Sequence, residues 1–170
     1  MSRFILHSLA SRALRTIDRL SPPATVEAHC DIPCGIYDPH LLQIGALTIL
    51  RMNQLIDALG DDAGKTKASL SRYILVKEEH AELVKREVRI IWGDYFKPEH
   101  LEKYPDLNEF VWGMLKLAGK ARQEINMQAA EDLLAQAQKF AEIFWDTKGV
   151  ATRTGGSNQA VGGELVYVAG

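Results

Sequence analysis

Apolar residues recur at spacings of three and four in four segments of the chain, which is the period of an amphipathic helix. The segments cover residues 41–59, 65–92, 107–118 and 130–145. Pro39 suits the first turn of the first segment, and Gly60 is a natural terminator after it. The links between the segments are short. The pattern therefore predicts an all-α fold, an antiparallel four-helix bundle.

The first two helices differ in the sides that they are expected to bury. Residues 41–50 are apolar nearly all round, so this stretch is expected to be buried on more than one side, as at a subunit contact. In the second helix an apolar column is interrupted at Lys77 and continues to Tyr95, which is expected to point toward one end of the bundle. The basic residues of this helix predict a solvated face: Lys77, Lys85, Arg86 and Arg89.

The two ends of the chain differ in composition from the helical part. Residues 149–170 are rich in Thr, Gly and Ser and predict a flexible tail, in which the apolar residues 165–168 are a candidate for docking as a short strand. Residues 1–28 are rich in Arg and poor in acidic residues. Four interpretations fit them: an ordinary first helix, a secretory signal, a mitochondrial presequence, or a propeptide removed between Ala28 and His29.

Charge and composition argue against several classes of function. A chain of 170 residues with 46% hydrophobic and 25% charged residues is expected to form one domain with tails. The net charge of −2 gives no electrostatic footprint for nucleic acid, and no apolar run is long enough to cross a bilayer. The two cysteines, Cys30 and Cys34, are too close in sequence to staple a domain, which favours a reducing compartment, the cytoplasm.

Those cysteines lie in the stretch with the clearest chemistry, HCDIPCGIYDP at residues 29–39. Thiolates are soft donors and imidazole is borderline, so His29, Cys30 and Cys34 together favour zinc, copper or nickel. Three ligands are too few for a closed structural zinc site, so further donors must come from the backbone, a distant side chain or a new amino terminus. Two buried thiols without a metal are the simpler interpretation of the spacing alone.

A new amino terminus at His29 would give this stretch a further donor. If the chain is cut between Ala28 and His29, the α-amine of His29, the deprotonated amide nitrogen of Cys30 and the two thiolates can lie in one plane. Such a plane suits nickel(II) or copper(II), and the His29 imidazole can reach the axial position. The uncut chain is expected to be a poor nickel site.

Two long motifs, in the same order along the chain, resemble one known family. Residues 29–39 are similar to the nickel-binding hook of nickel superoxide dismutase. The sequence WGDYFKPEHLEKYP at residues 92–105 is similar to the loop that packs over that hook. With IFW at residues 143–145, the resemblance runs from about His29 to Lys148.

The resemblance implies a function and a site. It implies a precursor trimmed before His29 by a processing peptidase, a homo-oligomer that is a hexamer in this family, and one nickel ion per subunit. The reaction is then the disproportionation of superoxide to oxygen and hydrogen peroxide through Ni(II)/Ni(III) cycling. The His29 imidazole would bind axially in the oxidised state, while Tyr37 and Tyr95 would order water and restrict entry to small anions.

Four more residues carry predictions around this site. Asp31 is expected to fix the hook through backbone amides or to be a solvated turn residue, and Pro33 to follow a cis peptide bond in a tight turn. The family usually has a glutamate at the position of Gly45 and an arginine at that of His80, and these orient the axial imidazole. In this chain His80 either makes a different contact or lies on the surface.

Two other functions are compatible with the residues. A non-catalytic zinc, copper or nickel carrier or sensor would use His29, Cys30 and Cys34 without the cut. A purely structural helical oligomer with a targeting peptide would not need either thiol. The remaining histidines are given no role: His7, His40 and His100.

Overall fold

A computed structural model describes residues 35–60 and 63–170 of the chain. This part contains four long helices: α2 (His40–Asp57), α3 (Ala63–Ile90), α5 (Leu107–Gln123) and α6 (Met127–Thr147). A π-helical turn, η2 (Ile91–Tyr95), and the short helix α4 (Pro98–Lys103) lie between α3 and α5. Two strands follow α6: β1 (Thr152–Gly156) and β2 (Glu164–Val168). The four predicted helices are confirmed, and the described part is mostly helical rather than all-α.

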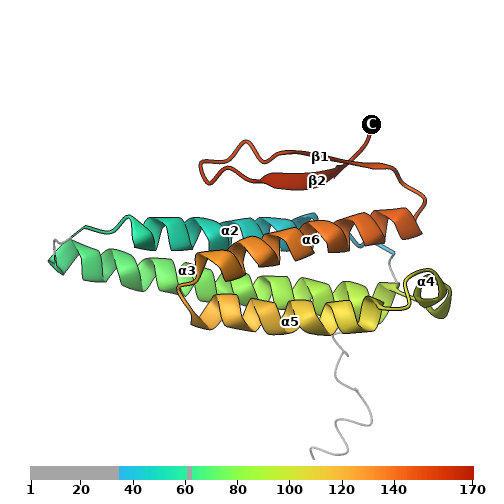
Figure 1. The fold of residues 1–170 in the computed structure, drawn as a ribbon, viewed down its shortest axis with the longest axis horizontal. Helices are drawn as coiled ribbons and strands as arrows, with labels where there is room; N and C mark the ends of the chain where they lie inside the picture. Colours follow the sequence, from blue (N-terminus) through green and yellow to red (C-terminus); the bar gives the residue numbers. More distant parts are fainter. Residues whose placement is uncertain (1–34, 61–62) are drawn as a thin grey trace, which may run out of the picture. The chain divides into compact units, whose positions relative to one another are not determined.

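The four long helices lie side by side, and consecutive ones run in opposite directions (Figure 1). α2 packs against α3 and α6, and α5 packs against the same two helices. Their apolar faces meet in one core, whose members Val84, Met114 and Phe140 come from three different helices and are fully buried. The helical period of the sequence thus produces a single apolar interior.

The first residues of α2 follow the local signals of the sequence. The carboxylate of Asp38 accepts a hydrogen bond from the backbone N–H of His40, at 2.7 Å. This satisfies one of the N–H groups that have no partner within a first helical turn. Pro39 is buried between them, and the helix begins immediately after it. The predicted helix start is therefore confirmed.

The segment after Lys148 is a β-hairpin, so the prediction of a flexible tail is wrong over residues 152–168. β1 and β2 pair antiparallel, with Thr154 opposite Val166. Leu165 and Val166 are each only 2% exposed, and the hairpin lies over α2 and α6 (Figure 1). The apolar residues therefore dock as a strand, because burying them on the helices offsets the entropy of ordering a Gly-rich segment.

Gln43 of α2 binds the outer edge of this hairpin. Its amide Nε2 donates to the carbonyl of Val166 at 3.1 Å, and its Oε1 accepts from the N–H of Val166 at 2.8 Å. Gln43 is fully buried, so both of its polar ends are paired away from water. The hairpin thus covers a side of α2 that the sequence suggested for a subunit contact.

The turn of the hairpin comes close to the helices at Gly163. Its φ of +75° lies in the left-handed region that favours glycine. A Cβ at this position would lie 3.2 Å from Cδ1 of Leu47 and 3.4 Å from Cδ2 of Leu134. The absence of a side chain therefore allows the turn to rest on both α2 and α6.

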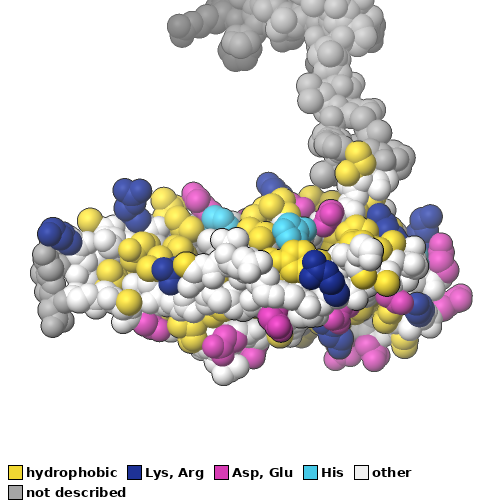
Figure 2. Space-filling model, turned by 90° about the horizontal axis from the view of Figure 1, so that it is seen from above, with side chains coloured by type: hydrophobic (Ala, Val, Ile, Leu, Met, Phe, Trp, Pro, Cys, Tyr) yellow, Lys and Arg dark blue, Asp and Glu magenta, His cyan; other side chains and the backbone are white. Residues whose placement is uncertain are grey.

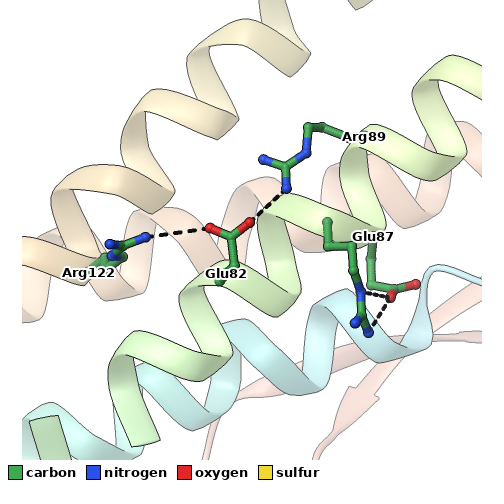
Figure 3. A network of polar contacts seen from close by, with 5 residues as sticks. Glu82, Glu87, Arg89 and Arg122 are labelled. Atoms are coloured by element: carbon green, nitrogen blue, oxygen red, sulfur yellow. Dashed lines mark hydrogen bonds and ion pairs between the residues drawn. The ribbon is translucent and has the colours of Figure 1, made fainter. Parts of the chain in front are cut away.

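Ion pairs connect α3 to α5 on the outside of the helices (Figure 3). Glu82 accepts from Arg89 at 2.7 Å within α3 and from Arg122 of α5 at 3.5 Å. Arg122 also pairs with Glu78 at 2.9 Å. Since all four side chains are 39–50% exposed, each pair is expected to contribute roughly 1 kcal/mol at most.

Lys77 of α3 departs from the predicted solvated basic face. It is 2% exposed, and its Nζ donates to the carbonyl of Glu124, the capping residue that follows α5, at 2.5 Å. Burial lowers the pKa of Lys77, an effect opposed by the charges of Glu78 and Glu124. Lys77 is buried because it lies in the apolar column of α3, which faces the neighbouring helices. Arg86 is exposed, as predicted.

Two features of the described residues bear on the predicted partners. None of the helices described is long and apolar enough to cross a membrane. Seen from above, basic and acidic side chains are interspersed (Figure 2). This face therefore has no extended field of one sign.

Removing the Gln43 amide is expected to loosen the hairpin. Gln43→Ala leaves the N–H and carbonyl of Val166 without these partners in a buried place, at a cost of about 1–3 kcal/mol in the free energy of unfolding. Urea unfolding of the full chain measures this as a lower midpoint.

The matched control is Gln138→Ala. Gln138 donates to the carbonyl of Glu164, but at an exposed place where water can replace it. Its loss is expected to be smaller than that of Gln43. Equal losses for the two variants would contradict the assigned role of Gln43.

Candidate functional site

The predicted metal ligands precede the part of the chain that the structure describes. His29, Cys30 and Cys34 lie outside it, as do Asp31 and Pro33. In the ranges 35–60 and 63–170, no three His, Cys, Asp or Glu side chains are grouped so that they could hold a metal ion. The described side chains that bear on the site are therefore those that follow the predicted ligands in sequence and those packed around them.

Tyr37 and Tyr95, which the resemblance places near the metal, are neighbours in the structure. Their ring centroids are 5.7 Å apart, with the ring planes tilted by 53°. Tyr37 lies three residues before α2, and Tyr95 ends the turn η2. In that turn the N–H of Phe96 donates to the carbonyl of Ile91, five residues earlier, at 3.3 Å. Such π-helical turns are frequent at functional sites.

Aromatic rings surround Tyr95. The centroids of Phe144 and Phe96 lie 4.6 Å and 5.2 Å from that of Tyr95. His100 of α4 stacks on Tyr95 at 5.3 Å with the planes 20° apart. Nδ1 of His100 accepts the N–H of Lys97 at 3.2 Å, so a neutral imidazole carries its proton on Nε2. The Tyr95 ring is therefore held by packing from several sides.

No role was predicted for His100. The sequence signal that could have located His100 is Pro98, because proline favours the first turn of a helix. A residue two positions further along can then reach back to the cap, as His100 does. Its stacking on Tyr95 follows from this short helix and not from any metal-binding motif.

Two residues at the end of α6 also contact Tyr95, and both were missed. The Tyr95 hydroxyl lies 2.9 Å from Oγ1 of Thr147. Nζ of Lys148 lies 5.3 Å from the Tyr95 ring centre and 4.7 Å from that of Phe144, in cation–π positions. No local sequence pattern marks these residues, because their partner Tyr95 lies far away along the chain.

A further polar cluster fastens the 93–105 connection to α6. The Tyr104 hydroxyl donates to the carboxylate of Asp146, and Lys103 pairs with the same carboxylate. Burial, and then the hydrogen bond to Asp146, raise the pKa of Tyr104 to about 12. The hydrogen bond from Lys103, and then that from Tyr104, lower the pKa of Asp146. The cluster thus ties α4 to the turn of α6 that carries Thr147.

Gly45 and His80, where the sequence departs from the family pattern, lie where α2 meets α3. A Cβ at Gly45 would be 2.8 Å from Cγ2 of Val84 and 3.3 Å from the carbonyl oxygen of His80. The half-buried imidazole of His80 donates from Nδ1 to the carbonyl of Val76, at 2.8 Å. The contact that His80 makes here is therefore within α3. Its influence on the hook stays a prediction.

Comparisons with known proteins agree with the sequence motifs. The family described as nickel-containing superoxide dismutase matches residues 24–148. The superoxide dismutase [Ni] of Streptomyces coelicolor is 40% identical over 128 residues, which are 75% of this chain and 94% of the relative. That of Streptomyces seoulensis is 34% identical over 128 residues, with the same coverage of 75% and 94%.

A solved native structure of a nickel superoxide dismutase resembles the fold. It is 35% identical with a TM-score of 0.64, and the similarity covers 71% of this chain and 99% of that one. A structure with nickel ligation corresponding to the oxidised state is 33% identical with a TM-score of 0.65, at the same coverage of 71% and 99%. This chain belongs to the nickel-containing superoxide dismutase family. The family match ends at residue 148, before the hairpin.

Adding a methyl group at Gly45 is expected to destabilise the helix contact. Gly45→Ala must displace the stiff side chain of Val84, and overpacking of this kind costs about 1–3 kcal/mol. The higher helix propensity of alanine offsets up to about 1 kcal/mol of that cost. Thermal or urea unfolding is expected to show a net loss of stability.

Gly113→Ala in α5 is the matched control for Gly45. A Cβ there meets nothing within 4 Å, so only the propensity term applies, and the variant is expected to gain stability. A Gly45→Ala protein as stable as Gly113→Ala would show that α2 and α3 are not in close contact at Gly45.

Asp146→Asn is expected to lower the pKa of Tyr104, because it removes the negative charge that favours the neutral phenol and replaces the carboxylate with a weaker, neutral acceptor. In the native protein the raised pKa adds stability that is fully present below pH 10.0 and is lost as the pH rises toward 12. A tyrosinate absorbance titration, with Tyr104→Phe to identify the transition, measures the change. The control Asp132→Asn, at an exposed site in α6, is expected to leave the pKa of Tyr104 unaltered.

Proposed function

We propose that the chain acts as a nickel-dependent superoxide dismutase after cleavage between Ala28 and His29. The observation that carries the proposal is the family match over residues 24–148, which includes every proposed metal donor and both tyrosines. The substrate is superoxide, and the products are oxygen and hydrogen peroxide. The enzyme is therefore an oxidoreductase with one nickel ion per subunit.

The donor set of the hook fits nickel. The two thiolates of Cys30 and Cys34, the Cys30 amidate and the His29 amine are anionic or strongly donating ligands, and they would hold the nickel ion. When bound, nickel supplies one-electron chemistry by alternating between Ni(II) and Ni(III), at a potential that such ligands bring into the range of superoxide. The His29 imidazole would be a further nickel ligand. Asp31 would hold the hook through backbone amides, and Pro33 would form its tight turn.

The roles of Tyr37 and Tyr95 are to order water and to restrict entry to small anions. Their contact at 5.7 Å supports this proposal, because two facing phenols leave little room for a larger ligand between them. The packing of Phe144 and His100 on Tyr95 would keep its ring in place. Lys148 adds a positive charge beside these rings, which favours the approach of an anion.

The finer architecture follows from the same proposal. The four long helices would form an antiparallel bundle that carries the hook at its amino-terminal end. The active protein would be a homo-oligomer, a hexamer, in which neighbouring subunits could cover the short hook and keep it rigid. A processing peptidase would remove residues 1–28. The two thiols favour the cytoplasm as the location.

The test compares the full chain with a chain that begins at His29 and keeps every described residue. Only the trimmed chain is expected to hold one nickel ion, because only it has the His29 amine. Native mass spectrometry with metal analysis measures the loading, and superoxide decay measures the activity.

Cys30→Ser and Cys34→Ser in the trimmed chain are the controls, and each is expected to abolish nickel loading and activity. If the full and trimmed chains bind zinc equally and show no dismutase activity, a metal carrier or sensor replaces the enzyme. If neither chain binds metal, the structural helical oligomer is the remaining explanation.

A further inference from the structure

The hydrogen bonds of the Thr147 side chain show which group receives its hydroxyl proton. Oγ1 of Thr147 lies 2.6 Å from the carbonyl oxygen of Phe144, one turn earlier in α6. A carbonyl oxygen only accepts hydrogen bonds, so the single hydroxyl proton of Thr147 points to Phe144. A threonine in a helix commonly makes this bond to its own backbone. Thr147 therefore has only lone pairs to offer to any other group.

The Tyr95 hydroxyl is the group that meets these lone pairs, at 2.9 Å. Since the proton of Thr147 is already engaged, Tyr95 must donate the hydrogen bond between them. The phenolic oxygen of Tyr95 is then left with lone pairs toward its surroundings. It can accept a hydrogen bond from water or from a protonated ligand, but it cannot donate one to a bare anion.

The packing of Tyr95 keeps this arrangement fixed. Phe144 supplies the carbonyl that orients Thr147, and its ring also packs on Tyr95 at 4.6 Å. On another side the imidazole of His100 stacks on the same ring at 5.3 Å. A ring with these neighbours cannot swing away from Thr147 without losing contacts on both sides.

We propose that Thr147 is a positioning residue that turns the Tyr95 phenol into a hydrogen-bond acceptor at the candidate site. This inference rests on the proposed function, in which Tyr95 lies where superoxide approaches. Superoxide and the peroxide anion are acceptors, so neither can bind to Tyr95 directly. Tyr95 instead holds a water molecule or protonated peroxide, and Thr147 thereby disfavours the retention of a bare anion.

The first measurement needs no metal and uses the full chain. The phenol C–O and ring vibrations of Tyr95, obtained from the difference spectrum against Tyr95→Phe, report whether the hydroxyl donates or accepts. Wild type and Thr147→Ser, which keeps the oxygen, are expected to show a donating phenol. Thr147→Val, which keeps the shape without the oxygen, is expected to lose that signature.

A donor signature that persists in Thr147→Val would overturn the proposal, as would the same spectrum in the serine and valine variants. Circular dichroism and thermal unfolding of all variants show whether each has folded. Should the valine variant not fold, Thr147→Ala beside Thr147→Ser provides the same comparison of oxygen present and absent.

The second measurement uses azide, an anion that can only accept, on the nickel-loaded trimmed chain. Thr147→Val frees the Tyr95 proton, so azide inhibition is expected to tighten by roughly tenfold, the effect of one hydrogen bond to a charged group. Thr147→Ser is expected to match wild type. Unchanged inhibition in the valine variant would overturn the role in anion retention.

The two measurements separate this proposal from the proposed function. If no nickel loads, the dismutase function fails, while the vibrational spectra still decide whether Thr147 orients Tyr95. If nickel loads and superoxide is consumed but the spectra show that the wild-type Tyr95 hydroxyl does not donate, the function stands and the proposal for Thr147 fails.

Discussion

The burial of α2 on several sides at once is the constraint on which the described structure depends. α3 approaches one side so closely that Gly45 has no room for a methyl group. α6 covers a second side, and β2 covers a third through the two hydrogen bonds of Gln43. Because α2 begins three residues after Tyr37, whatever fixes this helix also fixes the segment that carries Tyr37.

The candidate site is assembled at one end of the helices from segments that lie far apart along the chain. Tyr37 arrives from the segment before α2, Tyr95 from the π-helical turn, and Thr147 from the last turn of α6. Aromatic packing holds these parts together, while the cluster of Tyr104 and Asp146 ties the connection to α6 from another side. Separate packing and polar contacts thus act on the same connection, which suits a site that must keep its geometry during a redox cycle.

The hairpin gives this chain a feature beyond the family match, which ends at residue 148. It covers apolar surface of α2 and α6 that would otherwise face solvent or another molecule. The sequence suggested a subunit contact for this surface. A helix that is apolar all round indicates that its sides are covered, and another subunit is one way to cover them. The sequence cannot say which segment covers them, since that depends on contacts between residues far apart along the chain.

The sequence by itself determined the features that depend on neighbouring residues. The helical periods, the start of α2 after Pro39 and the soft donor set of His29, Cys30 and Cys34 are all local patterns. Only the tertiary structure decided that Lys77 of α3 is buried, which segment covers α2, and which hydroxyl lies beside that of Tyr95. The physical reason is that propensity and ligand chemistry act over a few residues. Burial and hydrogen-bond direction instead depend on which distant segments the packing brings together.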